Sequence, residues 1–320
     1  MRPHPTMRGL LVLATVAVGV IATVSTAAAA PTARYRLIDL GTLGGESSYA
    51  TAMNDNGAVV GRSATTGGDF HGFVWRGGRM TDLGDLSPTG INNRGQIIGT
   101  VDTASGTQAV LRSHGVTRNL GRMDWPAAIN NRGQIVGIDY LTTGGQVPLL
   151  WSHGTLRTLP LTDVSGINDR GQISGGRLLA TGGFHASAWW HNRVTDLGAG
   201  PFDRSNTYGI NDRGWIIGWV FSADQRERGA LWRHGTRTDV GTLGGGRTHL
   251  VSINDRGQIL ALSQLADGRD HPALWQHGRM IDLTDQGVTG DLDLVAINNR
   301  GDIAVSIRPV FGVSHAAVYR

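Results

Sequence analysis

The chain has 320 residues, no cysteine, and 29 basic residues that are all arginine, which excludes disulfides, Cys-ligated metal sites and lysine Schiff-base chemistry. Its net charge of +4 at pH 7, to which Arg2 and Arg8 of the first thirty residues contribute, is too small to indicate nucleic-acid binding. Glycine accounts for 48 residues without a period of three, which predicts many tight turns.

Residues 1–30 have the pattern of a secretory signal peptide. Arg2 and Arg8 precede an apolar run, and four consecutive alanines end the segment. An uncleaved membrane anchor is the alternative, because residues 10–30 are just long enough to span a bilayer. We expect a secreted, extracellular protein that has no membrane association once the signal is removed, with residues 31–320 forming a single domain.

A tetrapeptide Asn-(Asp/Asn)-x-Gly recurs along the rest of the chain. Each copy follows a small residue and an aliphatic one and precedes a short apolar run, which is typical of two β-strands joined by a tight turn. The seven copies start 38 to 44 residues apart, at Asn54, Asn92, Asn130, Asn168, Asn211, Asn254 and Asn298.

A second hairpin follows in every copy. Its first strand ends at an aromatic residue in six copies, a turn that is usually His-Gly comes next, and the second strand ends in Asp-Leu-Gly or a variant. One unit therefore has four short strands in about 40 residues, which is the size of a propeller blade. The six aromatic residues are Trp75, Trp151, Trp189, Trp232, Trp275 and Tyr319.

The two ends of the chain complement each other. The last unit stops at Arg320, one strand short, and residues 35–41 are an isolated copy of the missing strand. We therefore predict an all-β fold, a seven-bladed β-propeller whose last blade is closed by the N-terminal strand. An open array of hairpins, the alternative, would leave both ends unpaired.

The repeat also predicts the order of strands within a blade. The strand with the small residue should be innermost, where the blades converge, and the Asp-Leu-Gly strand outermost. The uniform Asn-Asp-x-Gly and His-Gly turns then share one face of the propeller, and the connections of variable length share the other. Because binding residues concentrate on variable loops, we expect function on the variable-loop face.

These motifs resemble the HAF-type bacterial extracellular repeat family. The resemblance rests on Asp-Leu-Gly-Thr-Leu-Gly-Gly at 39–45, its echo at 239–245, the Asn-Asp-x-Gly turns, and the strands that begin at His71, His185, His271 and His315. It covers nearly all of the chain after the signal peptide, although His-Ala-Phe itself never occurs intact. It implies a secreted or surface β-repeat protein of largely uncharacterised role, and it provides no catalytic residues.

The repeated histidines and turns are interpreted as structural. Equivalent histidines in successive blades are separated around the ring, whereas zinc needs three or four converging ligands. A single Asn-Asp-x-Gly turn offers too few oxygens for calcium. We therefore assign no metal, no cofactor and no catalytic residue.

Six of the turns carry arginine at their third position. A ring of positive charge would suit an anionic partner such as an acidic cell-wall polymer. We favour solvated turn residues that are offset by neighbouring aspartates. The six are Arg94, Arg132, Arg170, Arg213, Arg256 and Arg300.

Residues that break the repeat are the better candidates for ligand binding. Aromatic rings beside polar groups suit a sugar, because CH faces stack on rings and hydroxyls bond to carboxylates or arginine. Packing of loops between blades is the alternative for any single aromatic residue. The candidates on the variable-loop face are Trp125, Phe202, Asp203, Trp219, Arg226 and Glu227.

The functional prediction is a secreted, non-catalytic scaffold or binding module. It would be a monomer that recognises an extracellular glycan or protein and no nucleic acid. A propeller enzyme, a hydrolase or lyase with its site at the mouth of the central channel, is the alternative, because channel ligands come one per blade and leave no local motif.

Overall fold

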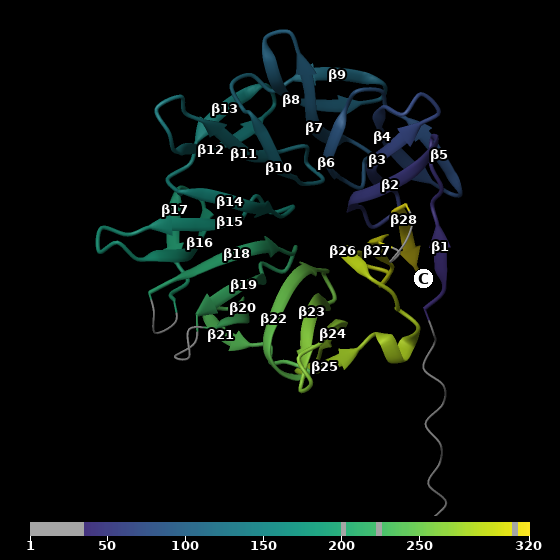
Figure 1. The fold of residues 1–320 in the computed structure, drawn as a ribbon. Coiled ribbons are helices and arrows are strands. Elements are labelled where there is room, and N and C mark those ends of the chain that lie inside the picture. Colours follow the sequence, from purple (N-terminus) through teal and green to yellow (C-terminus); the bar gives the residue numbers. More distant parts are fainter. Residues whose placement is uncertain (1–34, 200–202, 222–225, 309–312) are drawn as a thin grey trace, which may run out of the picture. The chain divides into compact units, whose positions relative to one another are not determined.

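The computed structural model describes residues 35–199, 203–221, 226–308 and 313–320, so the expected signal peptide lies outside the described residues. Seven four-stranded antiparallel sheets form a ring of blades around a central channel (Figure 1). The predicted all-β, seven-bladed β-propeller is confirmed. In the described part of the chain, no helix is long and apolar enough to cross a membrane.

In blades 1 to 3 the strands run consecutively from the channel to the rim. Blade 1 contains β2 (Gly44–Met53), β3 (Val59–Thr65), β4 (Phe70–Arg76) and β5 (Arg79–Asp82). Blade 2 contains β6 (Ser87–Ile91), β7 (Ile97–Thr103), β8 (Gly106–Ser113) and β9 (Val116–Asn119). Blade 3 contains β10 (Trp125–Ile129), β11 (Ile135–Tyr140), β12 (Gln146–Ser152) and β13 (Thr155–Thr158).

Blades 4 to 6 repeat this order. Blade 4 contains β14 (Asp163–Ile167), β15 (Ile173–Leu178), β16 (Phe184–Trp190) and β17 (Arg193–Asp196). Blade 5 contains β18 (Ser205–Ile210), β19 (Ile216–Phe221), β20 (Glu227–Arg233) and β21 (Thr236–Asp239). Blade 6 contains β22 (Gly244–Ile253), β23 (Ile259–Leu265), β24 (Asp270–Gln276) and β25 (Arg279–Asp282), and the 3-10 helix η1 (Thr284–Gln286) follows it.

Blade 7 joins the two ends of the propeller. Its strands from the channel outwards are β26 (Leu292–Ile297), β27 (Ile303–Ile307), β28 (His315–Tyr319) and β1 (Leu37–Asp39). Ile38 pairs with Val318, and the amide of Leu40 donates to the carbonyl of Ala316 at 3.0 Å. The predicted closure of the last blade by the N-terminal strand is therefore confirmed.

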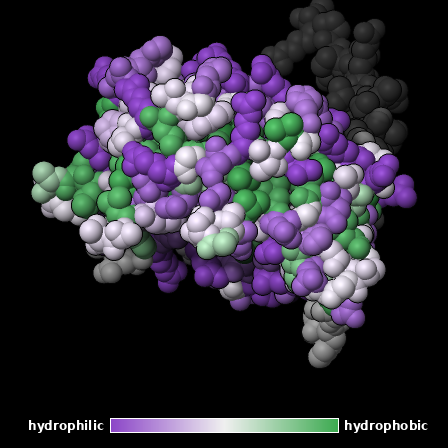
Figure 2. Space-filling view, turned by 90° about the horizontal axis from the view of Figure 1, so that it is seen from above, coloured by the Kyte–Doolittle hydropathy of each residue, from purple (hydrophilic) through white to green (hydrophobic). Residues whose placement is uncertain are grey.

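The hydrophobic core is divided among the junctions between blades. Seven clusters of buried side chains each bridge two successive blades. The cluster at the closing junction unites Leu40 from the N-terminal segment with Phe73 of blade 1 and Val318 of blade 7. Most of the outermost strands are exposed, and Figure 2 shows hydrophilic residues interspersed with smaller hydrophobic groups on the surface in view.

Both sets of repeated histidines have structural positions. His114, His153, His234 and His277 have φ of 50–51° and precede glycines of positive φ, as two-residue turns between twisted strands require. The strand-leading histidines instead contact an aspartate in the outermost strand of their own blade. Nδ1 lies 2.8–2.9 Å from the carboxylate in the pairs His71–Asp82, His185–Asp196, His271–Asp282 and His315–Asp39.

Candidate functional site

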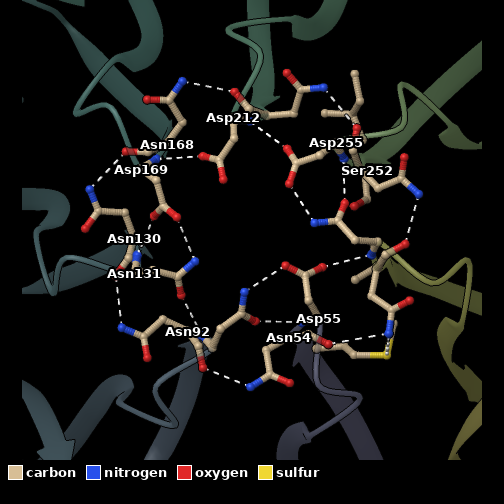
Figure 3. A pocket seen from close by; sticks show the side chains of 18 of the residues that line it. Asn54, Asp55, Asn92, Asn130, Asn131, Asn168, Asp169, Asp212, Ser252 and Asp255 are labelled. Carbon is tan, nitrogen blue, oxygen red and sulfur yellow. Dashed lines mark hydrogen bonds between the residues drawn. The ribbon is translucent and has the colours of Figure 1, made fainter.

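The channel mouth is lined by the Asn-Asp-x-Gly turns of all seven blades (Figure 3). The first asparagine of each turn is buried, and its side-chain amide donates to the backbone carbonyl of the equivalent asparagine in the next blade. These bonds measure 2.9–3.0 Å at six junctions and 3.5 Å from Asn298 to Asn54. The asparagines thus tie neighbouring blades together.

The second residues of these turns form another closed ring. Each backbone amide donates at 2.7–2.8 Å to the side-chain oxygen of the equivalent residue in the next blade. The ring contains four carboxylates and three amides, and three of its four aspartates occupy consecutive blades. Its members are Asp55, Asn93, Asn131, Asp169, Asp212, Asp255 and Asn299.

Among the three consecutive aspartates, Asp212 has a perturbed pKa. Burial, followed by the charges of Asp255 and Asp169, raises the pKa of Asp212 above its ordinary value. The other two carboxylates each accept an asparagine side-chain amide, at 2.9 Å for Asp169 and 2.6 Å for Asp255. The mouth encloses about 250 Å³. Within the described ranges, no three or more His, Cys, Asp or Glu side chains are placed to hold a metal ion.

A second polar cavity lies between blades 5 and 6, and we call it the blade 5/6 cleft. It has a volume of about 260 Å³ and is lined by Glu227, Arg247, Thr248, His249, Leu262 and Asp270. Glu227 is the first residue of β20, and Asp270 is the first residue of β24. Arg247, Thr248 and His249 lie on β22. The cleft therefore depends on the packing of two blades.

A β-bulge brings Tyr208 to this cleft. The register of β18 shifts between Thr207 and Gly209, which leaves Tyr208 as the extra residue. Its hydroxyl donates to Oε1 of Glu227 at 2.9 Å and lies 3.2 Å from Nδ1 of His249. The two rings meet edge to face with centroids 4.8 Å apart. Tyr208 thereby fixes the positions of both polar groups.

The charges of the cleft are set by these contacts. The hydrogen bond from His249 lowers the pKa of Glu227, and the bond from Tyr208 adds to this effect against the opposing effect of burial. Burial and the neighbouring Glu227 carboxylate raise the pKa of Tyr208, which keeps its hydroxyl protonated. Arg247 pairs with Asp270 across the cleft wall. The cleft therefore presents the ionised carboxylate of Glu227 beside the ion pair of Arg247 and Asp270.

The structure brings three of the predicted binding residues to this region. Trp219 pairs with Gly229, and Phe221 pairs with Glu227. Because directly opposed residues project from the same face of a sheet, Trp219 and Glu227 share one face of blade 5. The guanidinium of Arg226 lies against Gly246 of blade 6, where an added Cβ would come within 2.3 Å of it.

Two of the other predicted residues lie elsewhere. Trp125 is 45% exposed at the start of β10 in blade 3, two blades from the cleft. Asp203 lies between blades 4 and 5, where its Oδ1 is 2.6 Å from Nε2 of His185. Phe202 falls outside the described residues. Trp125 and Asp203 therefore do not contribute to the blade 5/6 cleft.

Sequence reasoning missed Tyr208, Arg247, His249 and Asp270. A usable signal was present in the repeat of residues 39–45 at 239–245. Aligning the two copies places Arg247 and His249 opposite Ser47 and Tyr49, so both differ from their counterparts. Tyr208 also breaks the repeat, because the other six blades have Thr, Ala, Ser or Val at this bulge position.

No family model matches the chain, and no curated protein is found to match its sequence. Among solved structures, it is similar to the β-propeller domain of the trilobed protease from Pyrococcus furiosus, with a TM-score of 0.62 and 9% identity over 86% of this chain and 96% of that chain. That domain is described as having an open velcro topology, whereas here β1 and β28 pair within one blade.

Lower similarity is found to propellers of different roles. The BP39L lectin from Burkholderia pseudomallei has a TM-score of 0.45 and 11% identity over 85% of this chain and 96% of that chain. The gluconolactonase XC5397 from Xanthomonas campestris has a TM-score of 0.42 and 10% identity over 90% of this chain and 91% of that chain. The similarity to the protease domain, at 9% identity, shows the fold alone.

Proposed function

We propose that the protein is a secreted, non-catalytic binding module that recognises a sugar unit of an extracellular glycan in the blade 5/6 cleft. The observation that supports this most directly is the group of Glu227, Arg247, His249 and Asp270 around one small cavity. Such a cavity, with a few fixed polar groups, is typical of a site for a small ligand.

The chemistry of the cleft suits a polyhydroxylated ring. The ionised carboxylate of Glu227 accepts hydrogen bonds from sugar hydroxyls, and the guanidinium of Arg247 donates to them. Trp219, on the same face of blade 5 as Glu227, is partly exposed and offers an indole face for sugar CH groups. Arg226 lies at the same blade junction.

The electrostatics of the blade 5/6 cleft favour binding over glycoside hydrolysis. A catalytic general acid in a glycosidase needs a carboxyl group whose pKa is raised, but hydrogen bonding from His249 lowers the pKa of Glu227. At the channel mouth, the site of the enzyme alternative, every aspartate already accepts a backbone hydrogen bond from a neighbouring blade. These groups stabilise the ring of blades.

A glycan array with the purified protein tests the proposal, followed by titration of the best ligand against Glu227→Gln. We expect the variant to lose about tenfold or more in affinity, because a charged acceptor becomes a neutral amide. Glu46→Gln is the matched control, because it changes the only other glutamate, which is exposed on β2 of blade 1.

Two results would contradict the proposal. One is equal loss of affinity in the two variants, and the other is absence of binding to any glycan on the array. Turnover of a glycoside, lactone or uronate substrate that is abolished by Asp212→Ala would instead support the enzyme at the channel mouth.

A further inference from the structure

The turn face, which carries the Asn-Asp-x-Gly and His-Gly turns, has arginines that no acidic group neutralises. The third-position arginines of the turns are exposed. Arg213 lies over the ring of Trp215, and Arg300 pairs with Asp302. Among the described residues, the guanidinium groups of Arg94, Arg132 and Arg170 have no hydrogen bond or ion pair.

Among the described residues, the neighbouring aspartates form no ion pair with Arg94, Arg132 or Arg170. Both carboxylate oxygens of Asp169, which precedes Arg170, accept hydrogen bonds from Asn131, at 2.7 and 2.9 Å. The carboxylate oxygens of Asp55 likewise accept hydrogen bonds from Asn299 and Asn93. The aspartates therefore serve the channel ring, and the arginine side chains are left to solvent.

Three successive grooves on this face are joined through the arginines. The first, of about 330 Å³, is lined by Arg76, Arg94, Arg300 and Arg320. The second, of about 690 Å³, contains Arg94, Arg118 and Arg132, and the third, of about 490 Å³, contains Arg132, Arg157 and Arg170. No aspartate or glutamate lines any of the three. We call this series of grooves the arginine arc.

Aromatic rings line two of the grooves beside the arginines. Trp151 lies in the second groove with His153, and Trp190 lies in the third, where it is 44% exposed. Arg157 lies over Trp189 at 5.2 Å in the third groove. An indole beside a guanidinium suits a pyranose ring that carries an anionic substituent, because the ring stacks while the anion forms a bidentate contact.

We infer that the arginine arc binds an anionic polysaccharide with repeated carboxylate or sulfate groups. Arg94 and Arg132 each belong to two grooves, so a chain that follows the arc meets a guanidinium at every passage from one groove to the next. This site lies on different turns and blades from the blade 5/6 cleft, and it stands whether or not that cleft binds a neutral glycan.

The test is a titration of the purified protein with polygalacturonate, dextran sulfate, neutral dextran and single-stranded DNA. Arg132→Gln should weaken binding of the anionic polysaccharide by about tenfold, because Arg132 contributes to two grooves. Arg256→Gln is the matched control, because it changes the same turn position in blade 6, outside the arc. Asn56 occupies this position in blade 1, which shows that the turn accepts a neutral polar residue.

Trp190→Ala separates carbohydrate recognition from simple charge attraction. It should weaken binding of the anionic polysaccharide by about fivefold, and neutral dextran should not bind. Preference for polygalacturonate would identify a carboxylate ligand, and preference for dextran sulfate a sulfate ligand. Glu227→Gln should leave this binding unchanged, which distinguishes failure of the arc from failure of the cleft.

Three results would overturn the inference. The first is no binding of either anionic polysaccharide. The second is equal loss in Arg132→Gln and Arg256→Gln, which would indicate diffuse charge. The third is equal affinity for single-stranded DNA with no effect of Trp190→Ala, which would make the arc a general polyanion surface.

Discussion

The inner strands of blades 1 and 6 share one backbone design. β2 and β22 each span ten residues and follow equivalent segments at 39–45 and 239–245. Thr42 and Thr242 donate to the carbonyls of Gly45 and Gly245, at 2.7 and 2.9 Å. The two strands are therefore closely similar scaffolds in different surroundings.

Their side chains serve different purposes. In blade 1, Ser48 contacts blade 7: its amide donates to the carbonyl of Ser314, and its Oγ accepts from the amide of Ala316. In blade 6, Arg247 and His249 line the blade 5/6 cleft. The comparison teaches that one backbone design supports closure of the ring at one place and a polar cavity at another, so the two roles should respond separately to mutation.

The largest effect should come from removing the closing strand. Deletion of residues 35–41 exposes an edge of β28 and removes buried Leu40, so the free energy of unfolding should fall by at least about 4 kcal/mol. Chemical denaturation measures the loss. Leu40→Ala and Val240→Ala, at equivalent buried positions of the two scaffolds, separate packing from closure. Unchanged stability after the deletion would show that β1 does not close the ring.

The asparagine ring should contribute to the stability of the fold. Asn130→Ala removes a side chain that is 3% exposed and that bonds Asn168 as well as two amides of its own turn. Unsatisfied buried groups remain, and we expect a loss of about 3 kcal/mol by chemical denaturation. Arg132→Gln, at an exposed position of the same turn, should cost less than about 0.5 kcal/mol. Similar losses in the two variants would refute a structural role of the ring.

Replacing two cleft side chains of β22 by the equivalent side chains of β2 should weaken ligand binding and preserve the fold. The double variant Arg247→Ser and His249→Tyr gives blade 6 the residues of blade 1. Affinity for the glycan ligand should fall about tenfold or more, with a stability change below about 1 kcal/mol. Calorimetric titration and thermal melting provide the two readouts. Retained affinity would show that Arg247 and His249 do not contribute to ligand binding.

The smallest effect should arise at the channel mouth. The pKa of Asp212 is raised by burial and neighbouring carboxylates, so its ionised form weakens the folded state above that pKa. Asp212→Asn should therefore stabilise the protein at pH 7 by less than about 1 kcal/mol, because the site is partly solvated. The gain should vanish as the pH falls toward the ordinary pKa of aspartate. Thermal melting across pH measures it, and a destabilised variant at pH 7 would contradict the account.

The repeat made most of the fold predictable. Seven copies of the Asn-Asp-x-Gly turn and the isolated strand at 35–41 were enough to predict the number of blades and the closure, because both depend on local patterns and counting. The bonds between Asn54 and Asn92 and their equivalents were not predicted, because they require the ring geometry that brings successive turns into contact.

The candidate site was predicted only in part. Trp219 stood out because it lies outside the repeating aromatic position, and Glu227 because it is a polar residue near it in sequence. The structure places them on one face of blade 5. Tyr208 and His249 reach Glu227 from other strands, and these contacts depend on how blades 5 and 6 pack together, which the sequence of a single blade does not specify. Trp125 also lies outside the repeating aromatic position, but it belongs to blade 3, two blades from the cleft.

Hydrogen–deuterium exchange with and without the glycan ligand from the array tests the central claim most directly. The account predicts slower exchange on binding in Glu227–Arg233 and Gly244–Ile253, the strands that form the blade 5/6 cleft. Protection confined to the channel-mouth turns or to other blades would contradict it.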